Sequence, residues 1–273
     1  MGIDTPAHNG SVFVSGLGSR AMIELEDRGD VKIVRMAAGK GNAINLEFAS
    51  ALIEALAEIE RGPAKAAILT GKGSVFGVGV DLPAMVAGGP DYVRKFLPLL
   101  QRSFEQLVLF PKPIVAAVNG HAIAGGAILM LACDQRLLAR GRARVGLTEV
   151  RVGVEFPTWA LETVRFATPP QHFSTLVCTG RTYEPEDALT RGLVDELVEP
   201  EHLLDRAYEI ADEMAAIPAS AFSATKRSVR RPLVEAARRQ AALEDAALIE
   251  KWASPETLSK MAEFAARTIG RRS

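Results

Sequence analysis

The sequence predicts an α/β fold, in which short buried strands alternate with helices. Residues 66–70 and 113–118 are short runs of β-branched and alanine side chains, a composition typical of buried strands. Residues 45–60 and 91–109 favour helices around those strands. Because such units recur without a low-complexity linker, we expect the helical segment at about 218–270 to pack on the same core.

Composition narrows the classes of function. At 273 residues the chain is long enough for one large domain or two small ones with ample core. It holds 32 basic and 33 acidic residues, a balance that argues against nucleic acid or an anionic membrane surface as partner. No apolar run reaches the length of a membrane span and no leader-like segment is evident, so we expect a cytoplasmic protein. Cys133 and Cys178 lack metal-site spacing and are expected in the core.

The first third of the chain contains a predicted hairpin and a capped helix. Residues 1–20 are rich in Gly and Ser, and we expect a flexible N-terminal extension there. Apolar and polar residues then alternate on both sides of a turn within 22–36, which predicts two paired strands. Asn45 is a suitable N-cap for the following helix, and residues 61–63, Arg-Gly-Pro, would end it.

Two glycine-rich turns each follow a predicted buried strand. The first, residues 71–82, lacks the order of a phosphate-binding loop. In the second, residues 119–127, Gly125 and Gly126 would lie where a strand gives way to a buried helix at 128–132. Main-chain N–H groups are unpaired at such a place and can point at an anion. The alternative is that both segments are structural turns without a ligand.

The second half of the chain is mostly helical by pattern. Helices are predicted at 159–167, 171–178, 185–191, 201–216 and across 218–270. The last segment carries a basic cluster, which we interpret as a solvated helix face. The cluster consists of Lys226, Arg227, Arg230, Arg231, Arg238 and Arg239.

Four segments resemble the signatures of the crotonase (enoyl-CoA hydratase/isomerase) superfamily. Residues 76–82 are similar to its Phe-x-x-Gly-apolar-Asp-apolar segment. Residues 113–134 are similar to its second signature, which runs from Pro through Asn-Gly and Gly-Gly to Cys-Asp. Residues 146–149 match its Gly-Leu-x-Glu element, and residues 187–195 match a late Ala-x-x-x-Gly-Leu-Val element. The resemblance extends over about 22–270.

The resemblance implies a fold, a substrate class and an assembly. It implies a crotonase-like spiral of ββα turns at 21–210, with a C-terminal helical trimerisation region at 211–273. The substrate would be an acyl-CoA thioester, so coenzyme A belongs to the substrate and no separate cofactor is expected. The chain would form a homotrimer or hexamer. The main-chain N–H groups of Val80 and Gly125 would bind the thioester oxygen, where two fixed donors stabilise an enolate by several kcal/mol.

The carboxylates decide which reaction the resemblance favours. Hydratases of this family use two glutamates; the position of the first is Ile128 here, and the second is Glu149. One carboxylate can move a proton from one carbon to another. Adding water is harder, because the same carboxylate would have to activate the water and also supply the proton. Pro157 and Trp159, together with the apolar Val80, resemble the mitochondrial Δ3,Δ2-enoyl-CoA isomerases. We therefore expect a double-bond shift.

Glu155 departs from the isomerase pattern, which is apolar at that position. Three roles stay open for it: a solvent-facing residue, a salt-bridge partner, or a second acid beside Glu149. The last role would return a hydratase or a hydrolase to contention. A non-catalytic acyl-CoA-binding protein is a further alternative.

The remaining site residues follow from the same comparison. The pKa of Glu149 should be raised by apolar neighbours, and Phe156 and Trp159 are candidates that either wall the acyl pocket or belong to the core. Asp81 and His121 are expected to be structural.

The resemblance also places coenzyme A against the loop at 39–45, which includes Ala43, and near Phe76 and Val78. Lys40 could meet a phosphate. Lys226 and Arg227 could reach the 3′-phosphate of a coenzyme A bound to a neighbouring subunit.

Overall fold

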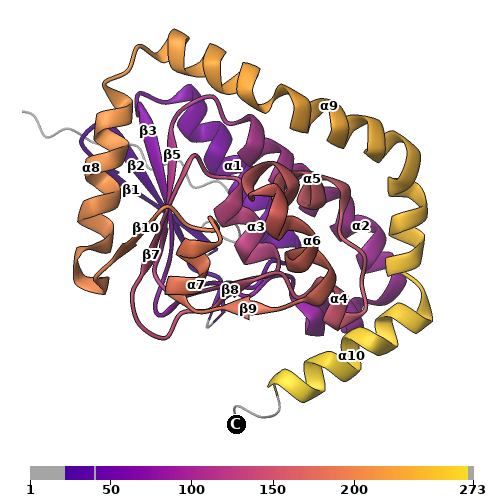
Figure 1. The fold of residues 1–273 in the computed structure, drawn as a ribbon. Coiled ribbons are helices and arrows are strands. Elements are labelled where there is room, and N and C mark those ends of the chain that lie inside the picture. The colour runs from indigo at the N-terminus through magenta and orange to yellow at the C-terminus, as the bar shows by residue number, and fades with distance from the viewer. Residues whose placement is uncertain (1–21, 40, 270–273) are drawn as a thin grey trace, which may run out of the picture.

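The computed structural model describes residues 22–39 and 41–269 and confirms the α/β class (Figure 1). The predicted extension at 1–20 and Lys40 lie outside the described residues. No helix among the described residues is long and apolar enough to cross a membrane.

A six-stranded sheet forms one layer of the core, in the order β1-β2-β3-β5-β7-β10. Its strands are β1 (Ile23–Arg28), β2 (Val31–Met36), β3 (Ala66–Gly71), β5 (Ile114–Val118), β7 (Gln135–Ala139) and β10 (Glu196–Val198). The first two form the predicted antiparallel hairpin, and the others join in parallel. Every residue of β3 and β5 is buried, as expected of parallel strands covered on both faces.

A second sheet of four very short strands was missed from the sequence. It consists of β4 (Val75–Gly77), β6 (His121–Ile123), β8 (Val145–Gly146) and β9 (Thr182–Tyr183). Strands of two or three residues are too short to show a period. The predicted direct passage from strand to helix at Gly125 therefore contains an additional strand, β6. With β3–β4, β5–β6 and β7–β8 each followed by a helix, the chain repeats a ββα turn.

The helices that follow the β1–β2 hairpin and the β3–β4 turn begin at identifiable caps. The Asn45 side chain accepts from the Phe48 N–H at 2.8 Å and starts α1 (Leu46–Arg61), which ends at Gly62. The Asp81 carboxylate accepts from the Ala84 N–H at 3.0 Å and starts α2 (Leu82–Leu109). This helix begins nine residues before the predicted start at 91, because the kink at Gly89, with φ of 62°, interrupts the apolar pattern.

Shorter helices follow the second and third turns, and longer ones complete the chain. They are α3 (Gly125–Leu131), α4 (Glu149–Val152), α5 (Thr158–Ala167), α6 (Pro170–Thr179), α7 (Pro185–Thr190), the 3₁₀ turn η2 (Pro200–His202), α8 (Leu203–Ala215), α9 (Ala219–Trp252) and α10 (Pro255–Ile269). Helix α8 packs on the six-stranded sheet. The predicted division after residue 210 falls inside this helix.

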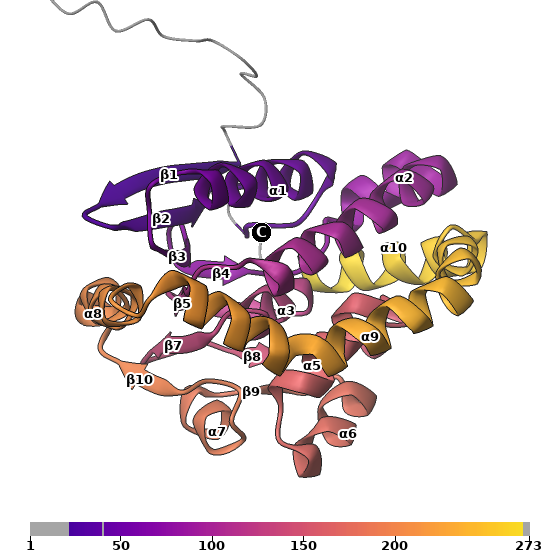
Figure 2. The same cartoon turned by 90° about the horizontal axis from the view of Figure 1, so that it is seen from above.

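Helices α9 and α10 wrap the outside of the core. Figures 1 and 2 show α9 running from α8 along the molecule to α10. Helix α9 packs on α2 and α5, and α10 packs on α2 and α4. The C-terminal helices therefore cover the same chain's core.

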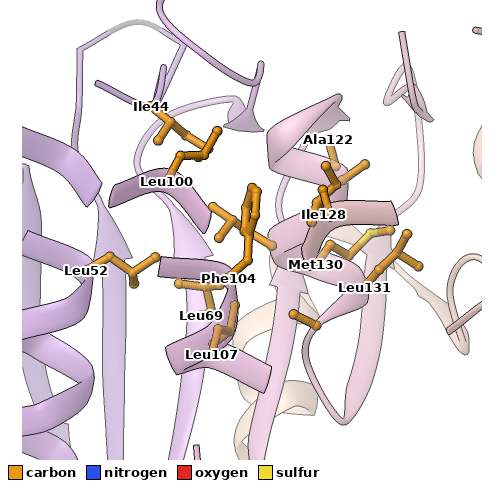
Figure 3. Packing of buried hydrophobic residues seen from close by; sticks show 14 of the residues in the cluster. Ile44, Leu52, Leu69, Leu100, Phe104, Leu107, Ala122, Ile128, Met130 and Leu131 are labelled. Carbon is orange, nitrogen blue, oxygen red and sulfur yellow. The ribbon is translucent and has the colours of Figure 1, made fainter. Parts of the chain in front are cut away.

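The main hydrophobic core lies between the six-stranded sheet and helices that include α1, α2 and α3. In Figure 3, Leu100 and Phe104 of α2 lie between Leu52 of α1 and Ile128 of α3. Cys133 is buried as expected. Cys178 was expected in the core but is exposed, because α6 buries only Leu176 and Val177.

The two glycine-rich turns lie in backbone contact. A Cβ atom on Gly126 would lie 2.2 Å from the carbonyl oxygen of Gly77. Gly79 has φ of +89°, and a Cβ atom there would lie 2.8 Å from the Cβ of Ala124. Atoms cannot approach so closely, so these positions exclude any side chain. The contact holds the loop before α2 against the turn before α3.

A buried ion cluster joins α9 to the core. Asp134 accepts from Lys226 Nζ and from Arg230 Nη2, each at 2.7 Å. The three side chains are 12% exposed or less. Lys226 and Arg230 also donate to the carbonyl oxygens of Lys112 and Val108. Burial lowers the pKa of Lys226 to about 8, although the Asp134 carboxylate opposes this shift.

The ion cluster corrects two expectations about the basic residues. Lys226 and Arg230 do not belong to a solvated helix face, whereas Arg227, Arg231, Arg238 and Arg239 are exposed. Lys226 is bound to Asp134 and is not available for a phosphate of a neighbouring subunit's ligand. The sequence alone does not show whether a basic residue in a helix is buried in an ion pair or exposed to solvent.

Replacing Asp134 with Asn should lower the free energy of unfolding by about 3–5 kcal/mol, because two buried cations lose their counter-charge. Urea denaturation measures this loss. The control is Asp205→Asn, which removes a surface pair with Arg28 and should cost less than about 1 kcal/mol. Equal losses in the two variants would contradict a structural role for the cluster.

Gly126→Ala should destabilise the protein by about 1–3 kcal/mol, because the added methyl group overlaps the Gly77 carbonyl. Gly73→Ala is the reference, since Gly73 has φ of +78° but open space around it. Its cost comes from the left-handed backbone alone, roughly 1–2 kcal/mol. Thermal and urea unfolding of both variants separate the two effects. A Gly126→Ala variant as stable as wild type would show that the turns need not touch.

Candidate functional site

A small cavity lies beside the two glycine turns, where α2, α3 and α4 meet the C-terminal helices. Its volume is about 60 Å³. The lining residues are Val78, Val80, Leu82, Leu100, Phe104, Ala124, Gly125, Ile128, Thr148, Glu149, Val152, Val154, Pro157, Trp252 and Phe264. Apart from Thr148 and Glu149, these described residues are apolar. A ligand group that enters this cavity is therefore surrounded by hydrocarbon and one carboxyl group.

Larger hollows exist elsewhere, but they lack comparable chemistry. One of about 510 Å³ lies between α9 and the end of α2 and is lined by exposed cations such as Arg227 and Arg231. It lies away from both glycine turns. Among the hollows lined by the described residues, the small cavity brings residues of both glycine turns, Val80 and Gly125, together with the buried acid Glu149, which makes it the candidate site.

The main-chain N–H groups of Val80 and Gly125 have no acceptor among the main-chain carbonyls of the described residues. Val80 bridges Ile44, whose N–H donates to the Gly79 carbonyl at 2.8 Å and whose carbonyl accepts from Asp81 at 2.9 Å. Gly125 is the first residue of α3, where N–H groups have no intrahelical partner. Both residues line the cavity. Two donors with no main-chain acceptor thus belong to one pocket.

Ala124 directs the second donor. It adopts φ of 51° and ψ of −124°, a conformation that costs an L-residue about 1–3 kcal/mol. Its N–H donates to the Gly146 carbonyl at 2.8 Å, which ties the turn to β8. This conformation could not be predicted from the sequence, because an alanine gives no signal of a glycine-like backbone.

Glu149 is the one carboxylate among the described residues that line the cavity. It begins α4, is 6% exposed, and its Oε2 has no hydrogen-bond partner among the described residues. Burial raises the pKa of Glu149 to about 7, while the N–H groups of Glu149 and Thr148 oppose this shift. A carboxyl group with this pKa is suited to exchange protons near neutral pH.

Several predicted site residues come together, and others do not. Val78, Val80, Gly125, Ile128 and Glu149 all line the cavity. The side chain of Ile128 takes the place where a second carboxylate would be expected.

Four predicted residues are absent from the cavity lining. Phe76 is fully buried and Trp159 nearly so, both in the main core. The main-chain N–H of Trp159 donates to the side-chain oxygen of Gln101. Phe156 packs against that core, and Ala43 is half-buried.

The aromatic side chains that line the cavity are Phe104 of α2 and two residues of the C-terminal helices. Trp252 ends α9 and Phe264 lies in α10. An amphipathic pattern shows only that a helix face is buried, so the sequence contained no signal for which face meets the site.

Glu155 is a salt-bridge partner of Lys251, one of the three roles left open. Its side chain is 55% exposed and does not line the cavity. Such an exposed pair contributes little to stability. The role of second acid beside Glu149 has no support in this geometry.

Glu149→Gln should stabilise the protein by about 3 kcal/mol at pH 8 and by less than about 1 kcal/mol at pH 5. Because the pKa of Glu149 is about 7 in the folded state and 4.5 otherwise, the folded state binds more protons between these values. Wild-type stability therefore falls as the pH rises through this range. Denaturation at both pH values measures the effect, with the exposed Glu155→Gln as control. A stability difference that does not change with pH would contradict the burial of an ionisable Glu149.

Comparisons with known proteins identify the family. The family profile for enoyl-CoA hydratase/isomerase matches residues 26–266. The chain is 36% identical over 190 residues to a putative enoyl-CoA hydratase of Thermus thermophilus, covering 68% of this chain and 74% of that protein. It is 28% identical over 215 residues to human mitochondrial enoyl-CoA delta isomerase 1, covering 78% and 71%.

The fold has a solved counterpart. Human mitochondrial delta3-delta2-enoyl-CoA isomerase superposes with a TM-score of 0.86 at 25% identity, covering 92% of this chain and all of that one. Hydratases and an isomerase thus both occur among the relatives, and the shared fold is the crotonase fold. The chain belongs to the enoyl-CoA hydratase/isomerase family.

Proposed function

We propose that this enzyme converts 3-enoyl-CoA to 2-enoyl-CoA, with Glu149 as its single acid and base. The observation that carries the proposal is the composition of the cavity. Among the described residues that line it, Glu149 is the only group with a pKa near neutrality, and Ile128 is apolar.

The proposed reaction needs no second acid. The Glu149 carboxylate removes a proton from C2, and the electrons of the broken C–H bond move onto the thioester oxygen. The Val80 and Gly125 N–H groups donate to that oxygen and stabilise the conjugated enolate. Glu149 then returns the proton to C4, and the double bond moves from C3–C4 to C2–C3. The proton and the electron pairs balance within the substrate.

Hydration is the competing reaction within the family. It requires one group to activate water and a proton to be delivered to the α-carbon. Glu149 would have to serve both steps, since the Glu155 side chain is exposed and paired with Lys251. The resemblance to the human isomerase supports the proposal. The resemblance to the Thermus protein favours hydration, so the experiment must distinguish the two reactions.

Coenzyme A binding and assembly remain proposals from the family resemblance. We propose that the loop at 39–45 and the segment around Phe76 and Val78 hold the coenzyme A moiety. We also propose a homotrimer or hexamer.

Purified wild-type protein should convert 3-hexenoyl-CoA to the conjugated 2-enoyl thioester, followed by its ultraviolet absorbance. Glu149→Gln should lower kcat by about 10²–10⁴-fold, because the amide cannot exchange the proton. Glu155→Gln, the matched control, should stay within about twofold of wild type, since its side chain lies outside the cavity.

Two results would overturn the proposal. Rapid hydration of 2-hexenoyl-CoA without isomerisation of the 3-enoyl substrate would assign a hydratase. Tight binding of the thioesters with no turnover of either would assign a non-catalytic acyl-CoA-binding protein.

A further inference from the structure

Two aromatic side chains from the C-terminal helices close the candidate acyl site. Trp252, the last residue of α9, is 2% exposed, and Phe264 of α10 is half-buried. Both line the cavity with Glu149. The cavity of about 60 Å³ is far below the roughly 300–1,000 Å³ of pockets for drug-sized ligands. The available space therefore suits a small group.

The position of Trp252 is tied to the segment that follows Glu149. Its Nε1 donates to the main-chain carbonyl of Glu155 at 3.1 Å. The preceding residue, Lys251, pairs with the carboxylate of the same Glu155. Because an indole has few rotatable bonds, these contacts hold the ring in the wall of the cavity.

The end of α9 that carries Trp252 is itself anchored to α2 and α5 by two acidic residues. Asp245 accepts from the Gln101 amide of α2 at 2.8 Å and from the Thr158 hydroxyl of α5 at 2.6 Å. Glu250 receives two hydrogen bonds of 2.8 Å from the Arg94 guanidinium of α2. These contacts resist an outward movement of the end of α9.

Helix α10 is held by apolar packing. Met261, one turn before Phe264, is fully buried, and the helix packs on α2 and α4. Phe264 is half-buried, so its ring lies nearer the surface than Trp252 does. The two rings thus close the cavity at different depths.

We propose that Trp252 and Phe264 form the end wall of the acyl site and restrict the enzyme to short-chain enoyl-CoA substrates. That the substrate is an enoyl-CoA rests on the proposed function. The restriction on acyl length rests on the cavity alone. A wall of this kind discriminates by about tenfold or more for each methylene group that does not fit.

The test compares kcat/KM for 3-hexenoyl-CoA and 3-decenoyl-CoA in wild type, Trp252→Leu and Phe264→Ala. Wild type should favour the hexenoyl substrate by at least about tenfold. Each variant should shift the ratio toward the decenoyl substrate by about tenfold. The matched control is Phe173→Ala, a half-buried aromatic residue of α6 that lies outside the cavity and should keep the wild-type ratio.

Equal wild-type activity on the two substrates, or variants that lose activity on both in proportion, would overturn the end wall. Affinities for saturated hexanoyl-CoA and decanoyl-CoA give a second readout that needs no turnover. If no 3-enoyl-CoA is isomerised, the proposed function is wrong, but the end wall is not contradicted. The end wall is still supported if wild type binds hexanoyl-CoA more tightly than decanoyl-CoA and this preference weakens in Phe264→Ala but not in Phe173→Ala. Equal affinities of wild type for the two thioesters would refute it.

Discussion

The backbone contact between the two glycine turns is the constraint on which the site depends. The Gly77 carbonyl and the Gly126 backbone approach so closely that a methyl group cannot come between them. Gly79 and Ala124 meet in the same region, one with φ of +89° and the other with φ of 51°. The donors at Val80 and Gly125 are adjacent to this contact, so their placement comes from packed main chain and involves no flexible side chain. Preorganised donors of this kind need no rearrangement when charge develops on the substrate.

Burial of Glu149 destabilises the fold and gives its carboxyl group a pKa near neutrality. A carboxylate in an apolar cavity is poorly solvated, and this raises its pKa to about 7. The same shift makes the group a base and an acid of comparable strength near neutral pH. Family relatives with a second glutamate can divide the work of adding water between two groups. Here the position of the first of those glutamates is Ile128, so Glu149 is the one carboxylate among the described residues that line the cavity.

The C-terminal helices connect global stability with the shape of the site. The cluster of Asp134, Lys226 and Arg230 fastens the first half of α9 to the core. The contacts of Asp245 and Glu250 fasten its second half to α2 and α5. The helix consequently places Trp252 against a cavity whose other lining residues, apart from Phe264, come from far earlier in the chain. Glu155, the position that departs from the isomerase pattern, contacts the end of this helix.

Local features of the sequence were sufficient for much of the fold. The Asn45 cap, the hairpin before it, the buried strands β3 and β5, and the glycines at 125 and 126 could be recognised because each depends on neighbours within a few residues. So could Glu149 and Ile128, through motif register. The short strands of the second sheet, the left-handed Ala124, the pairing of Lys226 with Asp134 and the aromatic wall could not be recognised. Each arises from contacts between residues distant in sequence, and a side chain's burial, partners and pKa are set by those contacts.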